Sequence, residues 1–136
     1  MRPMESGHFT RLSGDECRHL VRGHSVGRVC WLSGEGLQAL PVSYIVSSDR
    51  LFFRVDPDSV LGELAGTVPV IVEVDDIDVP TATGWSVIVR GEASEAPEPH
   101  HPAVPAPWAP GHRTLTVVVT PTAYSGRAVS ADHPRS

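Results

Sequence analysis

The chain has 136 residues, a hydrophobic share of 40% and a net charge of -5, which together indicate one ordinary globular domain. The negative charge argues against nucleic acid or an anionic membrane as a partner. All eleven basic residues are arginines, and the lack of lysine excludes a Schiff-base lysine and a P-loop lysine. The first ten residues lack the apolar segment of a secretion signal, so we expect a cytoplasmic protein.

The first regular element is predicted to be a short helix that follows a loose lead-in over residues 1–12. Ser13 and Glu16 have the spacing of a capping box, in which each side chain bonds to the backbone amide of the other residue. An apolar stripe follows at helical spacing, and Gly23 is expected to end the helix.

The pattern then changes to a period of two, which is typical of β-strands. A second short helix is predicted to start near Pro57 or Ser59 and to end at Gly66. Pro41 lies inside a predicted strand and requires an edge position or a bulge there. Six strands are predicted, over residues 26–33, 37–47, 50–55, 68–77, 85–96 and 113–120, the last one resuming across Pro121 to residue 129.

These elements predict a mainly β fold, a closed antiparallel barrel of six strands with two short helices. Residues 13–129 would form this single domain, and residues 130–136 a frayed tail. The stretch 97–112 carries six prolines and is predicted to be a loop.

One motif suggests a hydrolase, because residues 23–27 match the G-x-S-x-G pattern around Ser25. Asp75, Asp132 and His133 follow in the chain order of a catalytic triad. The motif, however, needs a turn from a strand into a helix, whereas here it follows a helix and precedes a strand. We therefore interpret it as a helix C-terminus and a turn.

No metal site is predicted. Cys17 and Cys30 have neither metal-ligand nor disulfide spacing, and no histidine pair has the spacing of a zinc-binding helix. An acidic cluster without the glycine turn of a calcium loop is interpreted as a solvated strand end. It comprises Glu73, Asp75, Asp76 and Asp78.

Two segments carry the most informative patterns. Residues 40–46 read Leu-Pro-Val-Ser-Tyr-Ile-Val and are followed by Asp-Arg-Leu-Phe-Phe-Arg at 49–54. Residues 84–91 read Gly-Trp-Ser-Val-Ile-Val-Arg-Gly, with Pro-Trp-Ala-Pro-Gly-His-Arg at 107–113 and Ser-Gly-Arg at 125–127. Over about residues 9–129, this ordered set resembles the flavin-nucleotide-binding subgroup of the pyridoxamine 5'-phosphate oxidase-like family.

The resemblance implies a split barrel that forms a homodimer, with two FMN sites in the clefts between the subunits. Arg54 would face the FMN phosphate, and Ser59 would donate a hydrogen bond to it. Tyr44 would pass near the flavin ring system, and Trp85 would lie on a strand that lines the dimer side. Trp108 of the partner chain would border the cleft.

The chain departs from the family pattern around the expected phosphate site. Ser43 replaces asparagine, Val55 replaces threonine, Asp58 replaces glycine and Val60 replaces lysine. Losing one cation and gaining one carboxylate both weaken a site for a phosphate dianion.

The leading hypothesis is a flavin-dependent oxidoreductase that binds FMN and acts on a small-molecule redox substrate. One alternative is a split-barrel dimer that has lost the flavin and binds another ligand, which the departures favour. Another is use of the deazaflavin F420, whose acidic tail needs a basic groove. No residue stands out as a general acid or base.

Overall fold

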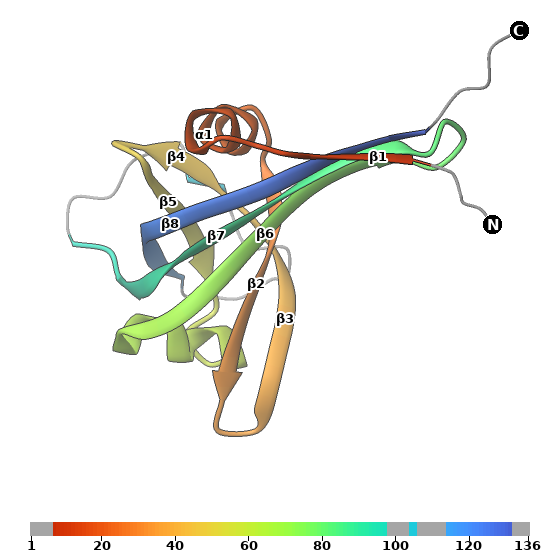
Figure 1. Cartoon of the computed structure of the whole chain (residues 1–136). Helices are drawn as coiled ribbons and strands as arrows, with labels where there is room; N and C mark the ends of the chain where they lie inside the picture. The colour runs from red at the N-terminus through yellow and green to blue at the C-terminus, as the bar shows by residue number, and fades with distance from the viewer. Residues whose placement is uncertain (1–6, 98–103, 106–113, 132–136) are drawn as a thin grey trace, which may run out of the picture.

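The computed structural model describes residues 7–97, 104–105 and 114–131, and every structural statement below concerns these residues. Figure 1 shows one strongly curled sheet with a helix at each end of the curl. The elements are β1 (Gly7–Arg11), α1 (Gly14–Arg22), β2 (Val26–Ser33), β3 (Gly36–Ser43), β4 (Ile45–Ser47), β5 (Arg50–Val55), the 3₁₀ helix η1 (Val60–Gly66), β6 (Val68–Asp78), β7 (Thr83–Glu95) and β8 (Leu115–Ala131).

All strand pairs are antiparallel, in the order β3-β2-β6-β7-β8-β5-β4, and β1 pairs with β8 outside this path. The two ends of the path, β3 and β4, are joined through Tyr44 along the chain and share no described ladder. The expected mainly β split barrel with two short helices is therefore confirmed, as a curled half-barrel whose sheet is open between β3 and β4 in the described part of the chain. Pro41 lies on β3, at the end of the sheet, as a residue without an amide hydrogen requires.

The six predicted strands correspond to eight described ones for two reasons. The segment 37–47 is divided at Tyr44, whose amide leaves the ladder and donates to the carbonyl of Ser25 (2.9 Å). Residues 7–11, which were expected to belong to the lead-in, pair with residues 127–131 of β8. Without β1, this end of β8 would be an uncovered sheet edge.

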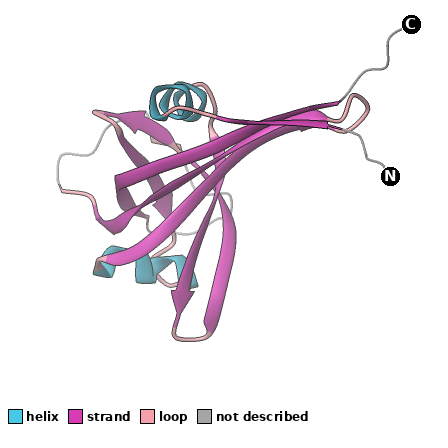
Figure 2. Ribbon diagram, viewed as in Figure 1, coloured by secondary structure: helices cyan, strands magenta, loops and turns pink. Residues whose placement is uncertain are grey.

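Both predicted helices are present. The capping box of α1 is confirmed, since the Ser13 amide donates to Glu16 Oε1 (2.8 Å) and the Glu16 amide to Ser13 Oγ (3.1 Å). Gly23 is the C-cap of α1, and Ser59 and Gly66 bound η1, which is a 3₁₀ rather than an α-helix. In Figure 2 the two helices lie against opposite ends of the curled sheet. None of the described helices is long and apolar enough to cross a membrane.

The core fills the inside of the curl. On β2, β6 and β7 the residues alternate between buried and more exposed, so one face of each strand enters the core. Burial of these aliphatic side chains supplies the main driving force for folding. Fully buried members include Val29, Leu51, Phe53, Leu64, Val72, Val74, Val87, Val89 and Val117.

Four strands extend beyond the barrel to form a projecting arm. We define the arm as β1, the ends of β6 and β7 over residues 75–86, and residues 127–131 of β8. Figure 1 shows it running away from both helices toward the chain termini. Its large exposed apolar side chains are Phe9, Ile77, Val79 and Val129.

Candidate functional site

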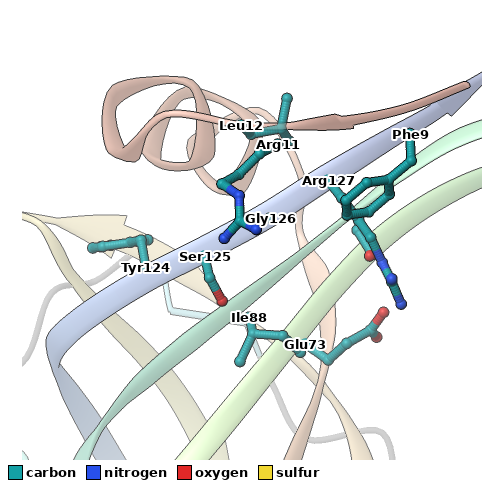
Figure 3. Close-up of a pocket in the computed structure, with 10 residues that line it drawn as sticks. Phe9, Arg11, Leu12, Glu73, Ile88, Tyr124, Ser125, Gly126 and Arg127 are labelled. Atoms are coloured by element: carbon teal, nitrogen blue, oxygen red, sulfur yellow. The ribbon is translucent and has the colours of Figure 1, made fainter.

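The most distinctive cavity lies where the arm leaves the barrel, on the outer face of the sheet (Figure 3). We call it the arginine hollow, and its volume is about 540 Å³. Alternation turns Glu73 of β6 and two side chains of β7 to this face, residues 124–127 of β8 border the hollow in succession, and β1 closes one side. It is lined by Phe9, Arg11, Leu12, Glu73, Ser86, Ile88, Tyr124, Ser125, Gly126 and Arg127.

Arginines gather around this hollow although the chain as a whole is acidic. Arg11 and Arg127 are register partners on β1 and β8, and the Arg127 guanidinium lies 5.3 Å from the centre of the Phe9 ring. Arg18 on α1 does not line the hollow, but it lies 4.9 Å from the ring centre of Tyr124, which does. Such cation–aromatic surfaces suit a planar, anionic ligand.

Gly126 shapes the base of the hollow by letting α1 approach β8. A Cβ atom at this position would lie 2.9 Å from both Cys17 Sγ and the Ser86 carbonyl oxygen. The Leu12 amide, just before α1, donates to the carbonyl of Gly126 (2.9 Å). The glycine of the Ser-Gly-Arg motif therefore has a packing role in this chain.

Glu73 is the carboxylate of the hollow. Its side chain is 23% exposed, and Arg28 Nη1 lies 3.8 Å from its Oε1. Burial, followed by a hydrogen bond and the negative charge of Asp75, raises the pKa of Glu73 to about 7, against a lowering effect of Arg28. Glu73 also lines a second hollow of about 500 Å³ formed with residues 23–28 and Pro41, so it borders both cavities.

We expect Glu73→Gln to stabilise the protein above pH 7 and to have little effect near pH 5. The folded protein keeps a proton that the unfolded chain, with an ordinary pKa of 4.5, releases. Stability is therefore lost as the pH rises from about 4.5 to about 7, and the neutral amide escapes this loss. After allowance for solvent screening, the gain at about pH 8 should be on the order of 1–2 kcal/mol, or a few degrees in Tm.

Thermal unfolding of both proteins at the two pH values measures this effect. Glu92→Gln removes the same charge from an exposed position on β7 and controls for net charge. An equal gain for Glu73→Gln at both pH values would contradict a protonated Glu73.

The residues expected to hold a phosphate lie far from the arginine hollow. Arg54 is half-buried on β5 and pairs with Thr116 at the start of β8. Arg127 lies eleven residues further along β8, a separation of roughly 35 Å along an extended strand. Arg54 itself does not line the hollow, whose nearest β8 residue is Tyr124, eight residues from Thr116.

Ser59 makes its hydrogen bonds within the turn before η1. Its hydroxyl donates to the Asp56 carbonyl (2.7 Å), and its amide donates to the same oxygen (3.0 Å). The Asp58 amide donates to Asp56 Oδ1 (2.9 Å). The Ser59 hydroxyl, which was expected to donate to a phosphate, thus donates to a backbone carbonyl of this chain instead.

The three expected aromatic residues have different surroundings. Tyr44 is 1% exposed, its hydroxyl donates to the Val21 carbonyl (2.6 Å), and burial raises its pKa, so its side chain belongs to the core. Trp85 is half-buried at the base of the arm, where the His24 ring meets it edge-on at 4.7 Å. Trp108 lies outside the described residues.

The structure bears out the interpretation of the G-x-S-x-G match. Gly23 ends α1 and Val26 begins β2, so the motif joins a helix to a strand. His24 Nδ1 lies 3.0 Å from the Leu20 carbonyl oxygen, and its Nε2 lies 3.5 Å from Asp76 Oδ2. Both ring nitrogens of His24 are therefore directed at groups other than Ser25. The two remaining triad candidates, residues 132 and 133, lie outside the described part of the chain.

We expect Ser25→Ala to leave folding and flavin binding unchanged within about 0.5 kcal/mol, as for a surface substitution. A fluorophosphonate probe should label neither protein. Labelling of the wild type that disappears in the variant would contradict this prediction and support a hydrolase.

Within the described residues, no group of three or more histidine, cysteine or acidic side chains could hold a metal ion. Phe9, Arg11 and Glu73 line the hollow but were not predicted as site residues. For Phe9 and Arg11 the available signal was the alternation along residues 9–11, which is too short to distinguish a strand from a lead-in. No pattern in the neighbouring sequence identifies Glu73 as a site residue, because its environment is created by β2 and β7.

A family model described as pyridoxamine 5'-phosphate oxidase matches residues 13–128. Among curated proteins, the uncharacterized protein Rv0080 of Mycobacterium tuberculosis is 27% identical, over 96% of this chain and 91% of that protein. The structure of an FAD binding protein from Mycobacterium smegmatis has a TM-score of 0.70 and 29% identity, covering 89% of this chain and 98% of that one. An FAD-binding protein from Mesorhizobium loti shares the fold, with a TM-score of 0.73 at 19% identity, over 91% of this chain and 98% of that one.

Proposed function

This chain belongs to the pyridoxamine 5'-phosphate oxidase family, and we propose that it binds a flavin nucleotide in a cleft formed by two copies of the chain. The observation that carries the proposal is the 29% identity to an FAD binding protein over 98% of that protein's length. The arginine hollow supplies fitting chemistry, since it combines aromatic and aliphatic walls with two arginines. A bound flavin would supply hydride transfer to or from a small-molecule substrate.

The separation of Arg54 from the hollow supports a site made by two chains. Along β8, roughly 26 Å of extended strand separates the register partner of Arg54 from Tyr124, where the hollow begins. A two-fold dimer can place the Arg54–Ser59 segment of one copy beside the hollow of the other. In this arrangement Arg54 faces the phosphate of the FMN moiety, while Ile88 and Tyr124 contact its apolar parts.

A dimer also accounts for the outer face of the sheet. Leu32 and Leu37 are register partners on β2 and β3 and are 71% and 84% exposed. A groove formed with Pro69 and Ile71 continues this apolar surface. A second copy is the occupant that completes the flavin cleft and covers these side chains at the same time.

We expect a homodimer at micromolar concentration, with a total buried area on the order of 1,600 Å² or more. Light scattering coupled to size exclusion measures the mass directly. Leu37→Glu should shift the protein toward the monomer and weaken flavin binding together with it. A monomeric wild type would rule out the two-chain cleft.

The visible absorption spectrum of freshly purified protein, followed by titration with FMN, FAD and F420, tests the cofactor. Flavin bands, or saturable binding of FMN or FAD, are expected. A colourless protein that binds none of the three would support the second candidate, a split barrel that binds another ligand. The internal hydrogen bond of the Ser59 hydroxyl favours that candidate, because it removes one expected phosphate donor.

A further inference from the structure

An exposed aromatic side chain stands at the rim of the arginine hollow, on the arm. Phe9 is 57% exposed, and the Arg127 guanidinium lies 5.3 Å from its ring centre. Figure 3 shows both side chains on the same side of the hollow. An aromatic ring beside a guanidinium forms a platform on which a planar base can stack.

Two unneutralised cations lie next to this platform. Arg11 follows Phe9 by two residues on β1, so both side chains leave the same face of the strand, and Arg127 is its register partner. Among the described residues, no carboxylate lies within ion-pair distance of Arg11 or Arg127. Figure 3 shows the two guanidinium groups at different places along the hollow, so each can bond to a different phosphate group of a pyrophosphate.

Acidic groups also border this surface. Glu73 and Asp75 are on β6, and Asp75 is in register with Ser86, which is in turn in register with Arg127. Two strand spacings, about 10 Å, therefore separate Asp75 from the backbone of Arg127. In Figure 3 the Arg127 side chain extends toward Glu73, whereas the Arg11 side chain ends away from it. The Arg11 end of the hollow is therefore the one better suited to a phosphate.

We propose that Phe9, Arg11 and Arg127 form a subsite for the adenosine diphosphate half of flavin adenine dinucleotide, so that the chain prefers FAD to FMN. The adenine stacks on Phe9 and the Arg127 guanidinium, and the pyrophosphate bonds to Arg11 and Arg127. The hollow, at about 540 Å³, has the volume of a site for a ligand of this class. This inference rests on the proposed flavin function, which it deepens.

Isothermal titration of the full chain with FAD, FMN and ADP tests the subsite. Phe9→Ala should lower FAD affinity about tenfold, as expected for losing one stacked base, and leave FMN affinity unchanged. Phe9→Trp should retain the FAD affinity. Arg11→Gln should lower FAD affinity about tenfold or more, by an amount that shrinks as salt rises. ADP should compete with FAD.

Ile77→Ala is the matched control, because Ile77 is 58% exposed on the arm but does not line the hollow. It should leave both affinities unchanged. Equal affinities for FAD and FMN, with Phe9→Ala changing both or neither, would overturn the subsite and leave the flavin proposal intact. If neither flavin binds, the flavin proposal fails, and the titration with ADP then tests the nucleotide subsite separately. ADP binding that is lost in Phe9→Ala would support the subsite. Absence of ADP binding would overturn it.

Discussion

The double variant Asp58→Gly and Val60→Lys is expected to bind FMN roughly tenfold to hundredfold more tightly than the wild type, since one charge-assisted contact is worth about 1.5–3 kcal/mol. The changes remove a carboxylate from the turn that precedes η1 and add a cation at the first residue of η1, a few residues along the chain from Arg54. Val60 is half-buried against the core, and the aliphatic stem of a lysine can keep part of that packing while its charge stays in solvent.

Flavin fluorescence titration measures this change, and riboflavin is the control ligand because it has no phosphate. The gain for FMN should shrink as salt rises, since the added charge is partly exposed. Asp58→Asn alone should give a smaller gain in the same direction. Equal gains for FMN and riboflavin, or no gain for either, would show that this turn does not hold a flavin phosphate.

Gly126→Ala is expected to cost about 2 kcal/mol of folding free energy, or roughly 6–10 °C in Tm, as overpacking does. The new Cβ would meet Cys17 Sγ on α1 and the Ser86 carbonyl oxygen on β7, each at 2.9 Å. Either α1 moves away from β8 or the ladder between β7 and β8 distorts. Both changes alter the arginine hollow, so flavin affinity should fall together with stability.

Gly34→Ala is the matched control, because a Cβ there meets no atom within 4 Å and the residue lies in the turn between β2 and β3. It should change the stability by less than about 0.5 kcal/mol. Thermal and denaturant unfolding of both variants measures the difference. Equal stability of the two variants would show that α1 does not pack on β8 as closely as described.

Local patterns predicted most of the elements. The Ser13–Glu16 spacing placed the start of α1, and the alternation along residues 26–33 and 68–77 placed β2 and most of β6. These predictions succeeded because capping and alternation depend on a few neighbouring residues. The ordered motifs also predicted the family, although no single motif was specific.

The predicted cofactor residues remain a prediction. Arg54 and Ser59 were chosen by position in a motif, and neither lines the arginine hollow. Tyr44 was expected near the flavin and lies in the core. A motif specifies residue types and their order, whereas the hydrogen bond from Tyr44 to Val21 depends on how α1 packs against the sheet.

The sequence by itself determined which face of each strand is apolar, where α1 begins and ends, and to which family the chain is similar, because these properties are encoded over short distances. The tertiary structure alone decided that β1 pairs with β8, that the described sheet stays open between β3 and β4, and that Arg11 is in register with Arg127. Alternation says which side chains share a face, but it does not say which strand lies beside which. That choice depends on contacts between segments more than a hundred residues apart, as for β1 and β8.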